Sequence, residues 1–506
     1  MKIIRSGLKP RKSLSAYTVG VLMILSISSA IAENIVNEKL TGDALSQGQV
    51  SAILDNTMEI DFAPDISHLS TAELQTLSHL KKAGHLIHEI YLNAQHKDAL
   101  ATKAQLIELA QKGNKQAQND LKLYRIFKGP IATTPENKRQ AFAKVAEETL
   151  GKNRYPWGIT KKQVTDFLSD HPEEKGSILH PRTIVKAVNK QNLSQDLAVL
   201  VQYPVLDTLH PGLKNQLVAL NKNKNKALYA VPYSVANADR ILKIYEQLWL
   251  ASETIKSTDS DFSDYLKNRA RDLLSDDYES GDASWITGSF GNINAQIGSY
   301  ETYDDALFST KTSFSMSILI KDRQRSEELA SAISGLQEIE NSLPYANHKN
   351  VRSNIPLGVY NVLADYGQSR GTNTASILPN ESYITRKYGR VILLRYNVLT
   401  SPEIFTSGKV IWDTVMNDKF DSHLNIQSNF KRTLWHEIGH YMGPATDKSG
   451  RTFDIALQNN QNLFEEMKSD LVSLFAANLL HKNNRYSDED LRAVYAGGVM
   501  RTLLLN

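Results

Sequence analysis

The chain has 506 residues and no cysteine, which excludes a disulfide scaffold, a cysteine-ligated metal and a cysteine nucleophile. Its formal net charge is +3, but the first 32 residues carry five basic and no acidic side chains. The remainder therefore carries about −2 (3 minus 5), a balance that does not indicate nucleic acid or an acidic lipid surface as a partner.

Residues 1–32 have the features of a secretory signal peptide. A basic segment precedes a largely apolar core at about 17–27, and Ala30-Ile31-Ala32 is a small-x-small cleavage site. The core is too short for a comfortable transmembrane helix and no other long apolar run follows, so we expect no stable membrane insertion after cleavage. The predicted location is exported, periplasmic or secreted. An uncleaved N-terminal anchor is the alternative.

The pattern of the remaining chain predicts an α+β protein that is predominantly α-helical. From residue 33 to about residue 170 the pattern is mostly helical and charged, with three-and-four apolar spacing at 74–82 and 103–127. The other predicted elements are a turn at 153–158, a solvated loop rather than a basic patch at 221–226, a strand at 228–235, a helical run at 239–274, and strands at 359–363 and 391–396.

The motif His436-Glu437-Ile438-Gly439-His440 predicts a metal-binding helix. Residues i and i+4 share one helical face, so the two imidazoles can bind one zinc ion, with Glu437 beside it as general base. Apolar residues recur at four-residue steps along this stretch and Gly443-Pro444 ends it, as in a buried helix. A surface helix with two solvated histidines is the alternative.

A second helix offers the third ligand. Glu466 would complete a His-His-Glu site with one position open for water, and Asp470, one turn later, is placed to accept a histidine N–H. Glu465 is the second carboxylate that we expect to support the ligands without binding the metal itself. Leu463, Met467, Leu471 and Leu474 form a separate apolar stripe on this helix. The alternative for this segment is a solvated acidic surface.

Several motifs between residue 155 and the C-terminus resemble the dipeptidyl peptidase III family of zinc metallopeptidases, in particular its shorter bacterial members with an uninterrupted HExxH motif. The stretches that carry the resemblance, besides the two metal motifs, are Ala230-Val231-Pro232-Tyr233-Ser234, Leu274-Ser275-Asp276-Asp277-Tyr278, Ile297-Gly298-Ser299-Tyr300-Glu301-Thr302-Tyr303-Asp304-Asp305-Ala306-Leu307-Phe308 and Leu378-Pro379-Asn380. Residues 33–150 add little to it.

The resemblance implies His436, His440 and Glu466 as ligands of one Zn²⁺ per chain, and Glu437 as base. It also implies two lobes around a wide cleft, a helical zinc lobe and a lower lobe that contains a small β-barrel. The domain ranges expected from it are a signal peptide at 1–32, an N-terminal helical region at 33–150, the lower lobe at 151–310 plus 355–400, and the zinc lobe at 311–354 plus 401–506.

The predicted substrate contacts are Asn294, Tyr300, Glu301, Tyr303 and Asn380, although the tyrosines and Glu301 could instead form a hydrogen-bonded loop that supports the cleft. The chain departs from the family at three points. Asn294 stands where members commonly have an acidic residue, Ile377 replaces a frequent asparagine, and a further histidine has no counterpart before Asn506.

These observations predict an exported zinc metallopeptidase that hydrolyses short peptides, with Glu437 taking a proton from water. Two alternatives remain. The first is a non-catalytic or weakly active zinc-containing protein that binds peptides. The second is a zinc hydrolase of a non-peptide amide. The sequence does not indicate the oligomeric state.

Overall fold

The computed structural model describes residues 44–504, apart from 224–225, 333–334, 347, 352–355, 370–372, 380, 445, 452 and 458–460. The predicted signal peptide at 1–32 lies outside the described residues and stays a prediction. Within the described ranges, no helix combines the length and the apolar character that a membrane span requires.

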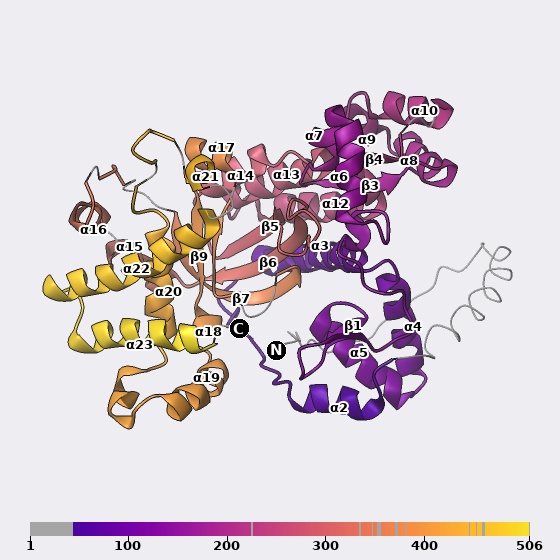
Figure 1. Cartoon of the computed structure of the whole chain (residues 1–506). Coiled ribbons are helices and arrows are strands. Elements are labelled where there is room, and N and C mark those ends of the chain that lie inside the picture. Colours follow the sequence, from indigo (N-terminus) through magenta and orange to yellow (C-terminus); the bar gives the residue numbers. More distant parts are fainter. Residues whose placement is uncertain are drawn as a thin grey trace.

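A mixed five-stranded sheet lies at the centre of the molecule, in the order β5-β6-β7-β9-β8 (Figure 1). Neighbouring strands run antiparallel except β7 and β9, which are parallel. Its strands are β5 (Ile293–Glu301), β6 (Ser313–Lys321), β7 (Leu357–Gly367), β8 (Ala375–Leu378) and β9 (Val391–Arg395). Two smaller pairs are β1 (Ile131–Thr133) with β2 (Arg139–Ala141), and β3 (Thr183–Ala187) with β4 (Leu228–Pro232).

The expected β-barrel is not found, because the strands in the described part of the chain form open sheets. β5 and β8 lie at opposite ends of the five-stranded sheet and do not pair with each other, whereas a barrel requires that closure. The predominantly helical α+β class is confirmed. The division into two lobes and the domain ranges stay predictions.

Helices from the first half of the chain form one layer on the sheet. α3 packs on β6 and β7, and α12 packs against both α3 and α13 (Figure 1). A capping box starts α3, in which Ser70 Oγ accepts from the Glu73 amide and Glu73 accepts from the Ser70 amide. The helices before β5 are α2 (Gln47–Asp55), α3 (Thr71–Gln95), α4 (Ala99–Gln111), α5 (Lys115–Phe127), α6 (Lys161–Asp170), α7 (Lys175–Ile178), α8 (Lys190–Gln202), α9 (Pro204–Leu209), α10 (Leu213–Asn223), α11 (Tyr233–Ala236), α12 (Ala238–Ile255), α13 (Ser260–Ser275) and α14 (Glu279–Thr287).

The predicted elements agree with these bounds in part. The stretch at 103–127 is two helices, α4 and α5, because Gly113 adopts a φ of 86° between them. The strand predicted at 228–235 ends at Pro232, where the short helix α11 begins. The helical run at 239–274 is confirmed as α12 and α13.

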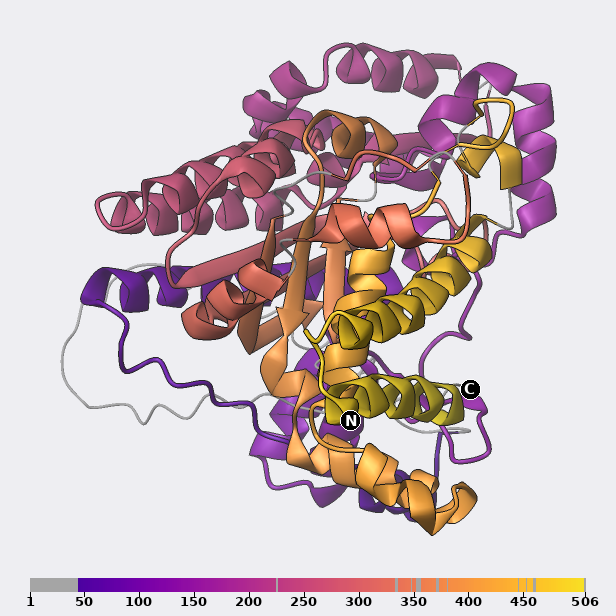
Figure 2. The same ribbon diagram turned by 90° about the vertical axis from the view of Figure 1, so that its left-hand side faces the viewer.

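The C-terminal helices occupy the opposite face of the sheet. Along β9, Val391 and Leu393 belong to the core under α3, whereas Ile392 and Leu394 point the other way and pack with Ile438 of α20. The yellow helices α22 and α23 lie in front in Figure 2, and both contact α20. The helices after β6 are α15 (Arg323–Ala332), α16 (Leu336–Ser342), α17 (Ser382–Lys387), α18 (Tyr396–Leu399), α19 (Pro402–Val415), α20 (Ser428–Gly439), α21 (Phe453–Leu457), α22 (Gln461–Lys482) and α23 (Asp488–Leu504).

Three of the four residues in the apolar stripe predicted on α22 face solvent, whereas Leu474 is partly buried. Leu463, Met467 and Leu471 are 69%, 48% and 59% exposed, respectively. α22 packs instead through a neighbouring face that includes Val472 and Ala476. Leu463, Met467 and Leu471 therefore do not hold α22 in place.

Candidate metal centre

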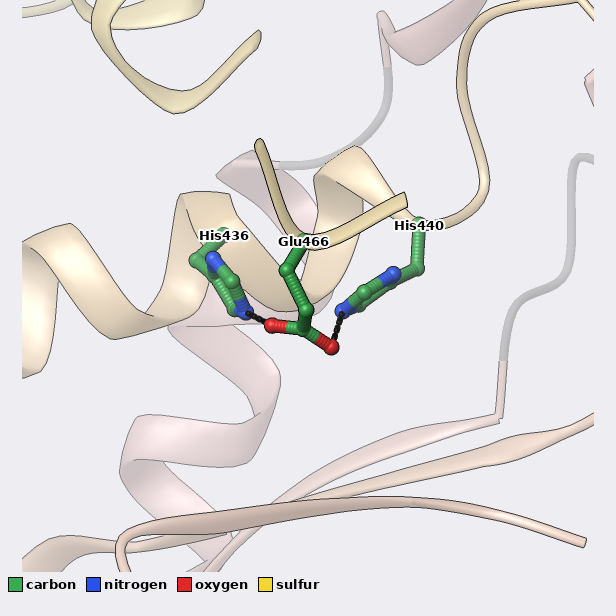
Figure 3. Close-up of side chains that lie close together, drawn as sticks. All are labelled: His436, His440 and Glu466. Atoms are coloured by element: carbon green, nitrogen blue, oxygen red, sulfur yellow. Dashed lines mark ion pairs between the residues drawn. The ribbon is translucent and has the colours of Figure 1, made fainter. Parts of the chain in front are cut away.

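His436 and His440 lie one helical turn apart at the C-terminal end of α20, with ring centroids 5.0 Å apart. Glu466 of α22 faces both rings (Figure 3). Its two carboxylate oxygens are 3.3 Å from His436 Nε2 and 3.8 Å from His440 Nε2. The three ligand atoms lie within 4.8 Å of one another, so the cluster could hold a metal ion. Two imidazole nitrogens and one carboxylate are a donor set that suits zinc.

Each histidine ring is oriented by a second carboxylate. His436 Nδ1 lies 2.8 Å from Asp470, and His440 Nδ1 lies 3.0 Å from Glu465. Because a carboxylate accepts hydrogen bonds, each ring donates from Nδ1, and a neutral ring then has its lone pair on Nε2. Both Nε2 atoms thus present lone pairs toward Glu466, as metal coordination requires.

Three residues around these carboxylates were missed by the sequence analysis. Arg432 donates to Asp470, Lys468 donates to Glu465 over 2.8 Å, and Ser469 Oγ lies 2.8 Å from His440 Nδ1. The available signal was spacing, since Arg432 stands four residues before His436, and Lys468 three residues after Glu465.

The charges of these neighbours keep the outer carboxylates ionised. Burial raises the pKa of Glu465, but the bond to His440 and the charge of Lys468 outweigh it and lower that pKa to about 2. Asp470 behaves in the same way, because His436 and Arg432 outweigh burial and lower its pKa to about 2. The two histidines therefore keep ionised acceptors throughout the neutral range.

Glu437 follows His436 directly and is 9% exposed. Burial raises the pKa of this carboxyl, while the nearby charges of His436 and His440 oppose the shift. A carboxylate whose pKa moves toward neutrality is a better general base at neutral pH. Its burial beside the ligand cluster is compatible with the predicted role.

Two predicted substrate contacts on β5 are engaged within the core. Asn294 is 3% exposed; its Oδ1 accepts from Trp285 over 2.9 Å, and its Nδ2 donates to Tyr360 over 3.0 Å. Tyr300 is 7% exposed and its hydroxyl donates to Asp282 over 2.6 Å. Asn380 lies outside the described residues.

Glu301 ends β5, and Tyr303 follows it by two residues. Tyr303 is 84% exposed. Reduced hydration of its hydroxyl and a hydrogen bond with Glu301 raise the pKa of Tyr303, and the charge of Glu466 contributes to the same shift. The charge of Glu466 on α22 thus acts on a residue of the loop after β5, which residue spacing alone does not predict.

The fold is similar to that of solved dipeptidyl peptidase III structures. The enzyme from Caldithrix abyssi superimposes with a TM-score of 0.71 and 22% identity, covering 87% of this chain and 77% of that one. The enzyme from Corallococcus sp. strain EGB gives a TM-score of 0.72 and 22% identity, covering 90% of this chain and 79% of that one.

At the level of sequence, the protein named Nudix hydrolase 3 from Arabidopsis thaliana is 26% identical over 353 residues, which is 68% of this chain. The chain spans 43% of the length of that relative. No protein-family model matches the sequence. The structural comparison nonetheless confirms the resemblance at the level of architecture: the chain has a dipeptidyl peptidase III-like fold.

Proposed function

We propose that this chain is an exported zinc-dependent metallopeptidase that hydrolyses short peptides in the manner of dipeptidyl peptidase III, with the substrate lying in a cleft between two lobes. The observation that supports it most is the convergence of His436 Nε2, His440 Nε2 and the Glu466 carboxylate beside buried Glu437. The fold likeness supports the same reading.

When bound, zinc would supply Lewis-acid activation of water and of the scissile carbonyl. The protein's own residues supply the remaining chemistry. Glu437 takes a proton from the attacking water and returns it to the leaving amine, which its raised pKa favours. Asp470 and Glu465 keep the two histidine rings in their metal-binding orientation.

Two features would hold an extended peptide. β8 is an end strand of the sheet and contacts α20, the helix of His436 and His440, so its backbone can pair with a peptide as an added strand. The charge of Glu466 acts on the hydroxyl of Tyr303, which is also hydrogen-bonded with Glu301. In this proposal the carboxylate of Glu301 accepts from the substrate's α-amine, and the hydroxyl of Tyr303 donates to a substrate carbonyl.

The test is turnover of a panel of unmodified tri- to hexapeptides by the zinc-loaded protein, with and without a chelator. We expect cleavage that the chelator abolishes and added zinc restores. The matched control is Glu437→Gln, which keeps all three ligands. Zinc and peptide binding without any turnover would instead show a non-catalytic peptide-binding protein. Failure to bind or cleave any peptide would contradict the proposal.

Export is tested separately, by N-terminal sequencing of the protein from the producing cell. Cleavage after Ala32 gives a mature chain that begins at Glu33. A protein outside the cytoplasm that still begins at Met1 would show an uncleaved anchor.

A further inference from the structure

Tyr300 interrupts the pairing of β5 with β6. Ser299 pairs with Phe314 and Glu301 pairs with Ser313, so Tyr300 has no partner in the ladder and forms a bulge. A bulge re-aims the side chains that follow it. Glu301 comes directly after this one, and Tyr303 two residues later.

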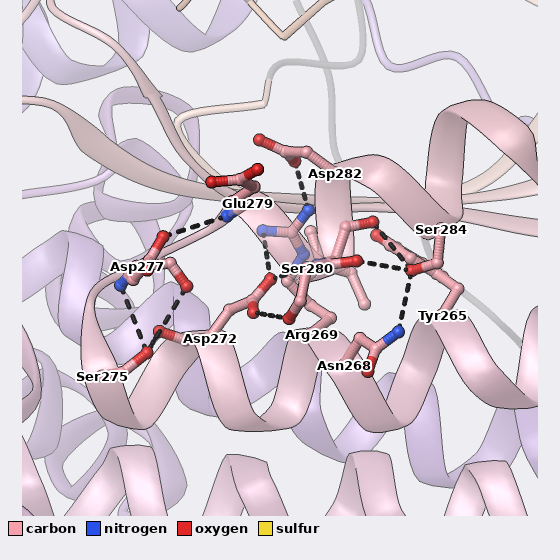
Figure 4. Close-up of polar contacts among 12 residues, drawn as sticks. Tyr265, Asn268, Arg269, Asp272, Ser275, Asp277, Glu279, Ser280, Asp282 and Ser284 are labelled. Carbon is pink, nitrogen blue, oxygen red and sulfur yellow. Dashed lines mark hydrogen bonds and ion pairs between the residues drawn. The ribbon is translucent and has the colours of Figure 1, made fainter. Parts of the chain in front are cut away.

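The side chain of Tyr300 is anchored in a buried ionic cluster. Its hydroxyl donates to Asp282 over 2.6 Å, and Asp282 also accepts from Arg269. Asp282 and Arg269 are fully buried. Figure 4 shows Arg269 of α13 between Asp282 and Asp272, whose carboxylate lies 3.3 Å from Arg269 Nη1. Two helices thus fix the acceptor that Tyr300 uses.

Close packing leaves the ring of Tyr300 little freedom. A Cβ on Gly298 would lie 2.4 Å from the Tyr300 ring, so only glycine permits this approach. The ring of Tyr278 also meets that of Tyr300 edge-on, with centroids 5.8 Å apart. The hydroxyl bond and the packing together define one position for the bulge.

The loop after the bulge is also held at its far end. Asp305 is 3% exposed and accepts from four backbone amides, those of Leu307, Phe308, Thr310 and Lys311, at 3.1, 3.2, 2.9 and 2.8 Å. Between these two anchors lies Tyr303, whose side chain is exposed and whose hydroxyl is influenced by the charge of Glu466. A short segment fixed at both ends holds its polar groups in a defined direction.

We propose that Tyr300 is a positioning residue, whose buried hydrogen bond to Asp282 sets the bulge that aims Glu301 and Tyr303 at the substrate beside the metal cluster. The proposal rests on the peptidase function proposed above. It assigns Tyr300 a role without substrate contact, in place of the contact predicted from the sequence.

The test compares Tyr300→Phe with Tyr278→Phe in the zinc-loaded protein. Both changes remove one buried hydroxyl from neighbouring rings, but within the described residues the Tyr278 hydroxyl has no hydrogen-bond partner. Thermal unfolding and zinc content establish that each variant is folded and loaded. Amide hydrogen exchange of residues 300–304 reports the loop, and calorimetry with tetraalanine on a Glu437→Gln background reports substrate binding without turnover.

We expect Tyr300→Phe to speed amide exchange in residues 300–304 and to weaken tetraalanine binding by about tenfold. For Tyr278→Phe, we expect the exchange rates and the tetraalanine affinity to stay within about twofold of those of its parent. Equal exchange in the two variants, or faster exchange without weaker binding, would overturn the positioning role. The two proteins that carry native Tyr300 test the proposed function itself. If the unsubstituted protein cleaves no peptide and Glu437→Gln binds none, the proposed function fails, and the positioning role fails with it.

Discussion

His436 Nδ1 lies 2.8 Å from Asp470 Oδ1, one turn of α22 beyond the predicted metal ligand Glu466. One helix therefore supplies both a candidate ligand and the acceptor that orients a second candidate ligand. Arg432, on the helix of the histidines, donates to the same Asp470. The contact between α20 and α22 and the geometry of the metal centre thus depend on the same side chains.

Replacing Asp470 with asparagine tests this relationship. The variant keeps the size of the side chain but loses the charge that favours the Nδ1–H tautomer of His436. We expect the affinity for zinc to fall roughly 10- to 100-fold, measured by competition with a chromophoric chelator. Asp413→Asn, on the exposed face of α19, is the matched control. Equal affinities in the two variants would contradict the orienting role.

The ligand assignment is tested by removing one donor at a time. His436→Ala, His440→Ala and Glu466→Ala should each lose stoichiometric zinc, because each leaves only two protein ligands. Elemental analysis of protein dialysed against metal-free buffer is the measurement. His423→Ala, which removes a histidine outside the cluster, should retain one zinc per chain. Full zinc occupancy in His440→Ala would show that the assignment is wrong.

Glu437→Gln separates the base from the metal. The substitution leaves all three ligands in place and removes the group that takes the proton, so zinc content should be unchanged. Turnover of a cleaved peptide should fall by roughly 10²-fold or more. A variant that retains near-parental kcat would exclude Glu437 as the base.

Discrimination between free and blocked amino termini tests Glu301. With Asn294 and Ile377 at their positions, the sequence predicts poor discrimination. In the structure, Oδ1 and Nδ2 of the Asn294 amide are both hydrogen-bonded within the core. Glu301 is the acidic alternative. Glu301→Gln should lower kcat/KM for free-amine peptides by about tenfold, because charge-assisted bonds are roughly twice as strong as neutral ones. Matched acetylated peptides should be unaffected; an equal loss on both substrates would exclude amine recognition by Glu301.

Asp276 predicts a pH dependence of stability away from the metal centre. Burial raises its pKa from 3.8 to about 7, although the Ser234 amide donates to it. The pKa of this carboxyl is higher in the folded state than in the unfolded state, so its stabilising contribution is complete below about pH 4. It is lost as the pH rises through about 7.

Asp276→Asn removes this titration and tolerates the left-handed backbone at this position, where φ is 57°. The unfolding free energy of Asp276→Asn minus that of the parent should increase between pH 4 and pH 8 by an amount on the order of a few kcal/mol. Asp277→Asn, at the exposed neighbouring position, is the control. A constant difference between Asp276→Asn and the parent across this range would contradict the prediction.

The sequence by itself determined the helix that carries the two histidines and the residue types of the candidate metal site. The spacing of His436 and His440 is a local property, because four residues bring two side chains to one helical face in any fold. The same reasoning identified Glu466 and Asp470 on one face of the second helix. The burial of Ile438 follows from the apolar repeat in the same way.

Only the tertiary structure decided how β5 and β6 form and what their polar residues do. These strands bury polar side chains, namely Asn294, Ser313 and Ser317. Polar residues therefore do not mark an exposed face, and the sequence lacks the alternation that is typical of a half-exposed strand. Their partners are remote in sequence: Arg154 donates to Ser313, and Arg395 to Ser317.

The same limit applies to Tyr300 and to the apolar stripe of α22. Whether a tyrosine meets a substrate or a buried aspartate, and whether Leu463 meets a core or solvent, depends on which segments the chain places opposite them. Local spacing determines which side chains share a face. Only long-range packing determines what that face meets, because burial and hydrogen-bond partners come from residues far away in the sequence.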